Sequence, residues 1–303
     1  MKIGNKCGGS HRVGRGRMII GKLYRRLLLS GAVLVSLYAV CRVMIADWFL
    51  IPSESMTPTL LPGDEIVANK TLMGARIYTD FHFKKGGGEL HSFRLRGWRG
   101  IRRNDVVVFN RANHRKKIKF VLNNVYCKRC VALPGDTLSI IDGRYVNNNY
   151  PGVLGVEAEQ RRLQQTPDSL VDPHCLRAMP KDDHFQWTIR NFGPYYVPRK
   201  GDVMRISPKT ATLYRVLLEW ETGETIRIDW KRNRVMKDGK RWVWHRFQHN
   251  YYFMAGDHVE NSDDSRYKGP VPEEYIIGVV TRVIDSKDRE TNNRRWSRIG
   301  KAL

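Results

Sequence analysis

Two serines lie two positions apart in the segment IPSESMTPTLLPGDEIV, residues 51–67. A serine hydroxyl can attack a carbonyl carbon once a neighbouring base takes its proton, so Ser53 and Ser55 are candidate nucleophiles. The segment has three acids but no histidine, which is the commonest partner of such a serine. The base must therefore come from another part of the chain.

A lysine can serve as that base if its amine is neutral near the working pH. Burial lowers the pKa of a lysine because it penalises the charged form. Lys128 lies inside the apolar segment VYCKRCVAL, residues 125–133, whereas Lys70 ends a strand-like segment and can reach water. Since most strand lysines are solvated, this segment alone makes Lys128 one candidate among others.

The nine histidines suggest no metal site. His245 and His249 are four residues apart, but they lack the zincin glutamate and stand among aromatic residues typical of a strand. His258 is the only histidine inside a dense polar motif, GDHVENSDDSR. A Ser-His-Asp triad stays open on spacing, because such triads assemble in three dimensions.

The five cysteines, Cys7, Cys41, Cys127, Cys130 and Cys175, do not form the regular spacing of a disulfide framework. The single C-x-x-C at Cys127 and Cys130 has no second pair at zinc spacing. Residues three apart on a strand face opposite sides. We therefore predict no metal and no redox cofactor.

An apolar segment directly before the serines positions them. It reads LLLSGAVLVSLYAVCRVMIADWFLI and carries no charge before Arg42, with Trp48 as an interfacial anchor. Residues 1–26 hold eight basic residues and no acid, which favours a cytoplasmic tail. This predicts a transmembrane anchor at 27–49; a cleaved signal peptide or a buried helix fits less well.

The region after the anchor is predicted to be mainly β, in short segments rich in Val, Ile, Tyr and Trp. These segments are DEIVANK, DVVVF, VYCKRCVAL, TLSIIDGRYV, DVMRIS, TIRIDW, WVWHRF and YYFMAGD. One polar helix is predicted in GVEAEQRRLQQTPDS and a helical turn at the start of PEEYIIGVV. Residues 50–146 and 251–303 then form a partly closed β domain, with 147–250 as an inserted smaller subdomain.

The formal net charge of +23 calls for an anionic partner or surface. Beyond the tail, much of the excess lies in residues 84–119, where Arg and Lys alternate with Phe and Trp. Nucleic-acid binders show this pattern, but a domain tethered to a bilayer more economically faces anionic lipid. A solvated loop explains it equally well. We expect inner-membrane lipid as a partner and no specific nucleic acid.

Four segments in fixed order strongly resemble the type I signal peptidases, the bacterial leader peptidases, and most closely their Bacteroidetes-type members. The segments are PSESMTPTLLPGD (52–64), NDVVVF (104–109), KRCVALPGDTL (128–138) and GDHVENSDDSRYKGPVP (256–272). The resemblance implies a signal-peptidase-like (LexA-like) β catalytic domain. It also implies a membrane-bound serine endopeptidase, a hydrolase that removes signal peptides with a Ser-Lys dyad, without a cofactor and as a monomer.

The same resemblance assigns roles to four residues. Ser55 is the implied nucleophile and Lys128 the general base. Ser53 supplies a hydroxyl to the oxyanion hole, beside the backbone N–H of Ser55. Ser262 orients the lysine amine.

Further positions follow from the family pattern. Asp264 and Arg266 match a structural ion pair, which Arg129 is expected to join. Signal peptides bind as an added strand, and small residues at the first and third positions before the cut enter two shallow pockets. The matching pocket positions are Phe49, Ile51, Met56, Leu60 and Cys127.

The last segment departs from the family pattern. His258, Val259 and Glu260 stand where Asn-Arg-Asp is usual, so a carboxylate is kept and a cation is lost. This departure motivates an alternative, a dedicated maturation peptidase of a conjugation or secretion system. A membrane-tethered binding protein without catalysis is disfavoured by the intact Ser55 and Lys128. The expected location is the inner membrane, with the catalytic domain in the periplasm.

Overall fold

The computed structural model describes residues 11–79, 91–111, 113–114, 117–118 and 124–303. The start of the basic tail predicted for 1–26, Cys7 included, lies outside these residues, as does part of the basic stretch 84–119.

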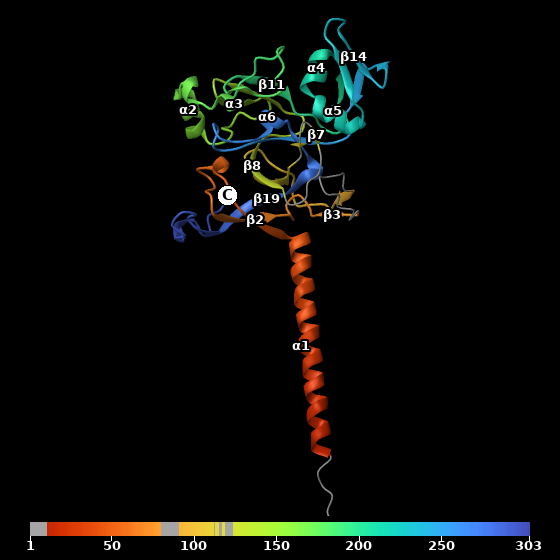
Figure 1. Ribbon diagram of the computed structural model, residues 1–303, viewed down its shortest axis with the longest axis vertical. Coiled ribbons are helices and arrows are strands. Elements are labelled where there is room, and N and C mark those ends of the chain that lie inside the picture. The colour runs from red at the N-terminus through yellow and green to blue at the C-terminus, as the bar shows by residue number, and fades with distance from the viewer. Residues whose placement is uncertain (1–10, 80–90, 112, 115–116, 119–123) are drawn as a thin grey trace, which may run out of the picture.

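One long helix, α1 (His11–Met44), projects from a β-rich body (Figure 1). Its part from Leu23 to Met44 has a mean hydropathy of 2.0 and buries none of its side chains against the protein. Twenty-two such residues are enough to cross a bilayer. The helix ends at Met44, so the predicted anchor range 27–49 extends into the first strand, β1 (Ala46–Leu50).

The junction between α1 and the body is held by charged side chains. Asp47 accepts hydrogen bonds from Arg42 and from the Lys70 amine, which also donates to the Arg42 carbonyl at 2.6 Å. The Arg42 guanidinium lies 4.4 Å from the ring centre of Trp48. Arg42, the charge that interrupts the apolar run, is therefore paired where the helix meets the sheet.

Among the described residues, the largest sheet has seven antiparallel strands in the order β1-β2-β19-β5-β8-β17-β18. The strands after β1 are β2 (Asp64–Asn69), β5 (Val106–Asn110), β8 (Val125–Ala132), β17 (Tyr251–Ala255), β18 (Val271–Pro272) and β19 (Ile276–Ser286). Smaller pairs in the same part of the chain are β3 (Arg76–Tyr78) with β4 (Ser92–Arg94) and β6 (Asn113–His114) with β7 (Lys117–Ile118). Short helical turns are η1 (Glu54–Met56), α6 (Ser265–Lys268), η3 (Glu273–Tyr275) and η4 (Trp296–Arg298).

The two faces of this sheet bury two separate apolar clusters, because alternate residues of a strand point to opposite sides. Val106 and Val108 of β5 enter one cluster, while Val107 and Phe109 enter the other. We call the first the inner cluster; its fully buried members are Ile51, Met56, Leu60, Ile66, Ala68, Val106, Val108, Val280 and Val283. The larger outer cluster continues into the region between residues 147 and 250.

That region is attached to the hairpin before it. The hairpin β9 (Thr137–Ile141)–β10 (Arg144–Asn147) turns at Asp142-Gly143, both at positive φ, as a type I′ turn requires. The first strand of the region, β11 (Phe192–Tyr196), pairs with β9 and so joins the same small sheet. The remaining elements are α2 (Glu157–Gln165), η2 (Asp168–Leu170), α3 (Pro173–Leu176), β12 (Val203–Arg205), α4 (Pro208–Leu213), α5 (Arg215–Thr222), β13 (Ile226–Asp229), β14 (Arg234–Lys237), β15 (Lys240–Arg241) and β16 (Trp244–Arg246).

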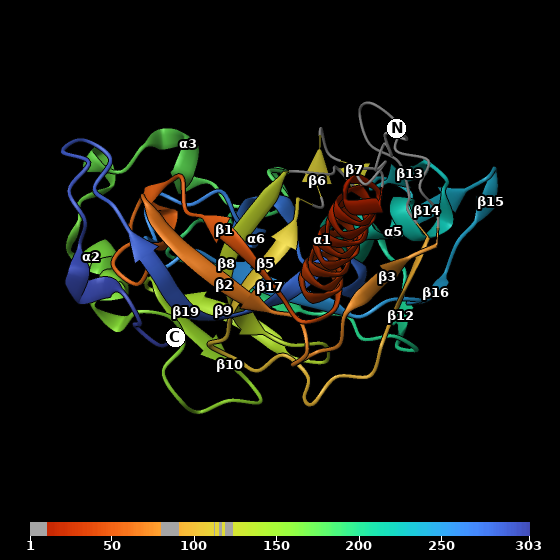
Figure 2. The same ribbon diagram turned by 90° about the horizontal axis from the view of Figure 1, so that it is seen from below.

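The mainly β architecture behind one N-terminal helix is as the sequence predicts, and each predicted β segment contains at least one strand. The polar helix is confirmed as α2 and the helical turn as η3. Helices α4 and α5 were not predicted, although Ser207 and Thr210 form a capping box before the first and Gly223 ends the second in the left-handed conformation. Figure 2 shows α2 and α3 on one side of the body and α5 with β13–β15 on the other.

Candidate active site

Ser55 and Lys128, 73 residues apart in sequence, meet beside the main sheet. Ser55 lies in η1, and Lys128 in the middle of β8. The Lys128 Nζ and the Ser55 Oγ are 2.5 Å apart, and the same amine donates to the Cys127 carbonyl at 3.1 Å. A neutral amine can make both contacts, since it accepts the serine proton with its lone pair and donates with its own N–H.

The surroundings of Lys128 favour the neutral amine. Only 3% of the residue is exposed. Burial lowers the pKa of Lys128, and this outweighs the opposite effect of nearby Asp264. No ion pair joins Lys128 to a carboxylate within the described part of the chain. A buried lysine with a hydroxyl for a neighbour is the arrangement that a general base needs.

The loop that carries Ser55 is held by apolar contacts with the inner cluster and by backbone hydrogen bonds to two other segments. Met56 and Leu60 insert into the inner cluster, and the Ile51 N–H donates to the Asp64 carbonyl at 2.8 Å. On the other side the His258 N–H donates to the Ser55 carbonyl at 3.2 Å. The loop is therefore tied both to the inner cluster and to the segment that contains His258.

Gly256 allows this close approach. A Cβ at that position would lie 2.1 Å from the Ser262 Oγ and 2.5 Å from the Ser55 carbonyl oxygen. Both distances are far shorter than van der Waals contact. Only glycine lets the segment starting at Gly256 pack this closely against the Ser55 loop.

The two other predicted serines are placed beside the dyad in different ways. The Ser53 Oγ lies 3.4 Å from the Ser55 Oγ and is exposed to solvent. Ser262 is 5% exposed, and its hydroxyl lies beside Asp264, whose pKa it helps to lower. The structure thus brings Ser262 close to the Ser55 loop at Gly256, without a direct hydrogen bond to Lys128 among the described residues.

Asp264 and Arg266 form a fully buried ion pair. Two guanidinium nitrogens of Arg266 donate to the carboxylate at 2.7 and 2.9 Å, and neither side chain is exposed. Asp264 also accepts from the Gly256 N–H at 2.8 Å. Burial alone would raise the pKa of Asp264. The charge and hydrogen bonds of Arg266 lower it by more, so the net pKa is below its usual range.

Arg129 does not join this pair, contrary to the sequence-based expectation. Its guanidinium binds Asp257 instead, with two hydrogen bonds of 2.6 and 2.7 Å. Neighbouring strand residues point to opposite sides, so Arg129 leaves β8 on the side away from Lys128. Asp257 was not among the predicted site residues, although it lies directly after Gly256 in the same motif.

The five predicted pocket residues come together. Ile51, Met56 and Leu60 belong to the inner cluster, and Phe49 and Cys127 pack against it. Three of them, Ile51, Met56 and Cys127, line a groove of about 430 Å3 between two stretches of chain, residues 51–56 and 124–128. The first stretch follows the edge strand β1 and the second belongs mainly to β8, three strands further along the sheet after β2, so the sheet curls to bring them together around the dyad.

The departure at residues 258–260 has a structural explanation. Val259 is 2% exposed and packs with Leu163, Val171 and Ile189 of the inserted region. Glu260 accepts a hydrogen bond of 3.0 Å from the Thr166 hydroxyl. The usual cation is thus replaced by an apolar contact that joins this segment to the region around α2.

The alternative bases and ligands are placed elsewhere. His245 and His249 bind the carboxylates of Glu221 and Glu274, at 2.7 Å each. His258 contacts Ser55 through its backbone, not its ring. Within the described ranges no group of three or more His, Cys, Asp or Glu could hold a metal, and burial raises the pKa of Cys127 to about 12, far from a reactive thiolate.

Comparison with known proteins gives a consistent result. Residues 24–284 match the protein family described as signal peptidase, peptidase S26. Signal peptidase I of Buchnera aphidicola subsp. Baizongia pistaciae is 28% identical over 80% of this chain and 70% of its own length. Those of Leptolyngbya laminosa and Pseudomonas fluorescens are each 28% identical, over 45% and 79% of this chain. The matches span 53% and 64% of these two relatives.

Proposed function

Because this chain belongs to the signal peptidase family, peptidase S26, we propose that it is a membrane-anchored serine endopeptidase that removes signal peptides from exported preproteins, with Ser55 and Lys128 as its catalytic dyad. The observation that carries the assignment of the dyad is the 2.5 Å contact between the Lys128 Nζ and the Ser55 Oγ at the base of the groove. Burial gives this lysine the lowered pKa that a neutral base requires.

The reaction has two steps. The Ser55 Oγ attacks the scissile carbonyl carbon while its proton moves to the Lys128 amine. The tetrahedral oxyanion is held by the Ser55 N–H and the Ser53 hydroxyl, and its collapse expels the amine of the mature protein, which takes the proton from Lys128. Water, deprotonated by Lys128, then hydrolyses the ester and frees the signal peptide.

The groove supports an extended substrate. Residues 125–128 of β8 pair with β5 on one edge, and on the other edge β17 reaches only to Arg129 within the described residues. An added strand can bind this open edge, the mode called β-augmentation. Side chains of its first and third residues before the cut then face the inner cluster, where the buried side chains of Met56 and Leu60 already fill the interior, which favours small residues.

The arrangement at the membrane is part of the proposal. Leu23–Met44 spans the inner membrane with the N-terminus in the cytoplasm, and the body lies in the periplasm. Exposed Trp98 and Phe93, among arginines of the same stretch, contact anionic lipid. One chain supplies both dyad residues, so the dyad is complete within a monomer, the state we propose.

Cleavage of a preprotein in detergent solution tests the proposal. We expect Ser55→Ala to yield no mature product, while Ser297→Ala, an exposed serine in η4, cleaves as the wild type does. The cut is located by mass spectrometry of the new N-terminus. Cleavage by Ser55→Ala at the wild-type rate would refute the dyad.

A further inference from the structure

A second, narrow pocket opens beside the groove, on the opposite face of β8 from the inner cluster. It shares Tyr126 and Asp263 with the groove, and the Lys128 Nζ lies 5.7 Å from the Tyr126 ring centre. Its other lining residues are Phe109, Arg111, Asp264, Ser265, Lys268, Gly269, Pro270 and Val271. We call it the side slot.

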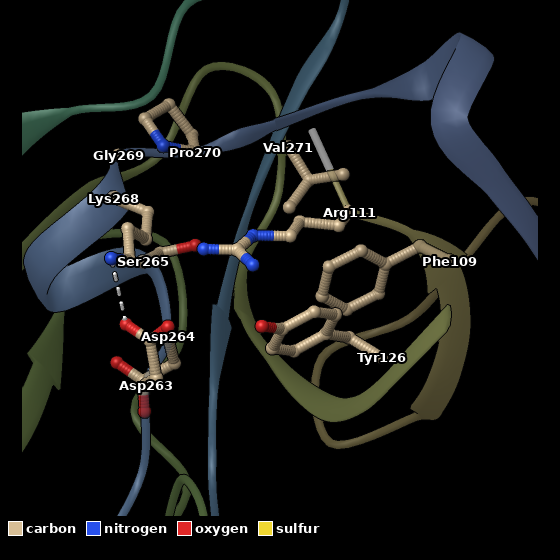
Figure 3. A pocket seen from close by; sticks show the side chains of 10 residues that line it. All are labelled: Phe109, Arg111, Tyr126, Asp263, Asp264, Ser265, Lys268, Gly269, Pro270 and Val271. Atoms are coloured by element: carbon tan, nitrogen blue, oxygen red, sulfur yellow. Dashed lines mark ion pairs between the residues drawn. The ribbon is translucent and has the colours of Figure 1, made fainter. Parts of the chain in front are cut away.

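The walls of the side slot are mainly apolar. Figure 3 shows the rings of Phe109 and Tyr126 on one side and Val271 on another, with the Arg111 side chain reaching between them toward Ser265. The ring centres of Phe109 and Tyr126 are 6.2 Å apart in a stacked arrangement. The slot is small, with about 30 Å3 of room around which its walls close. A slim apolar side chain fits such a space better than a broad or charged one.

The carboxylates at the mouth of the side slot are each paired with a basic side chain. Lys268 and Asp263 form an ion pair of 3.3 Å (Figure 3), and Asp264 is bound to Arg266. The slot therefore shows no uncompensated carboxylate that would select a cationic side chain.

The direction of a bound substrate follows from strand register. Pairing leads from Lys128 through β5, β19 and β2 to Ala46, where β1 begins next to the anchor helix. Because four antiparallel pairings make β8 parallel to β1, the residues of β8 before Lys128 lie on the side of that helix. A signal peptide that emerges from the membrane thus meets the Val125 end of β8 first and reaches Lys128 last. Residues before the cut lie along Val125–Lys128.

Alternation then assigns the side slot to one residue of the substrate. A strand added beside β8 has its two faces aligned with those of β8. If the first and third residues before the cut face the Cys127 side, the second residue, P2, faces the side of Tyr126 and Lys128. The side slot opens on that side, within the reach of one side chain from the dyad.

We propose that the side slot is a specificity subsite for the P2 residue of the signal peptide and that it selects slim apolar side chains such as Leu and Met. The proposal rests on the proposed function, since it needs a peptide bound at the dyad. It assigns a binding role to Val271 and Phe109, which lie outside the first motif.

Preproteins that differ only at P2 test the proposal. With Gly, Leu, Met, Asp and Trp at that position, we expect kcat/KM for Leu and Met to exceed the value for Gly by about tenfold, with Asp and Trp no better than Gly. Val271→Ala lengthens the slot and should raise the Trp-to-Leu ratio by about tenfold. Equal kcat/KM for all P2 residues, within twofold, would overturn the subsite.

A matched control separates selectivity from loss of stability. Val235→Ala makes the same change in a side chain that is 1% exposed, on β14 of the inserted region. We expect its P2 ratios to equal those of the wild type; a shift identical to that of Val271→Ala would also refute the proposal. If Ser55→Ala still cleaves these substrates, the dyad fails, whereas equal P2 rates with an inactive Ser55→Ala reject only the side slot.

Discussion

Two lysines, the half-buried Lys70 at the membrane junction and the buried Lys128 at the dyad, differ in what their amines touch. Burial lowers the pKa of both. The Lys70 amine donates to the Asp47 carboxylate and to a carbonyl, and both partners are best matched by an ammonium ion. The Lys128 amine meets the Ser55 hydroxyl, which can give up a proton. Burial thus makes a lysine available as a base only where its nearest partner is itself a proton donor.

Replacing each lysine by methionine is the strongest way to break this comparison. Lys128→Met should lower kcat for preprotein cleavage by at least about 10³-fold, because no other group accepts the Ser55 proton. Lys70→Met removes a similar chain length and burial but leaves the dyad intact, so it should keep most of the activity. Single-turnover cleavage of one preprotein by both variants measures this, and equal losses would show that the two lysines do not differ in kind.

The ion pairs near the two lysines should differ in stability. Asp264→Asn leaves Arg266 buried without its partner, and we expect the free energy of unfolding to fall by about 3–5 kcal/mol. Asp47→Asn acts on a pair in which the Arg42 side chain is 37% exposed, so a loss of about 1 kcal/mol or less is expected. Denaturant unfolding of the two variants in detergent provides the comparison. A larger loss for Asp47→Asn would contradict the assignment of Asp264 and Arg266 as the structural pair.

The Ser53 hydroxyl beside the dyad should affect kcat and leave substrate binding unchanged. Ser53→Ala is expected to lower kcat by about 10²–10³-fold, since the oxyanion exists only in the transition state, and to leave KM unchanged. Ser92→Ala, in β4 among the basic residues of 92–105, is the control. A Ser53→Ala enzyme with the wild-type kcat would remove Ser53 from the oxyanion hole.

The pH profile sharpens the comparison further. Lys128 works only when neutral, so kcat/KM should rise with pH through its pKa. The Asp263 charge raises the pKa of Lys128, which means that Asp263→Asn should move this rise to lower pH. Asp47→Asn acts on Lys70 in the same sense and should leave the profile where it is. Initial rates across a pH series decide this; a profile that follows Asp47 would make Lys70 the base.

Much of this site can be read from local sequence. The motifs locate Ser55 and Lys128, and the apolar neighbours of Lys128 indicate a buried strand. The partner of Arg129 could not be read in this way, because it depends on which face of β8 the side chain leaves. The same holds for Val259, which looks like a lost cation in sequence and forms an apolar contact in three dimensions.

Boundaries and the inserted region were harder to predict. The apolar residues of β1 continue those of α1, and only pairing with β2 makes them a strand. Helices α4 and α5 have caps in their sequence, but the threonines of α4 and the valine and tryptophan of α5 also suit a strand. The predicted division into residues 50–146, 147–250 and 251–303 stays a prediction. Strand β9, before the boundary at residue 146, and strand β11, after it, belong to one sheet.

The junction of α1 with the sheet also fixes the distance between the anchor helix and the Ser55 loop. Contacts among Arg42, Asp47 and Lys70 hold the helix end against β1 and β2. The five residues of β1, about 17 Å at 3.3 Å per residue, set how far the Ser55 loop lies from the helix end. A peptide is then cut at a set distance from the end of the anchor helix, and this distance limits the spacing between its apolar core and the scissile bond before any pocket contacts a side chain.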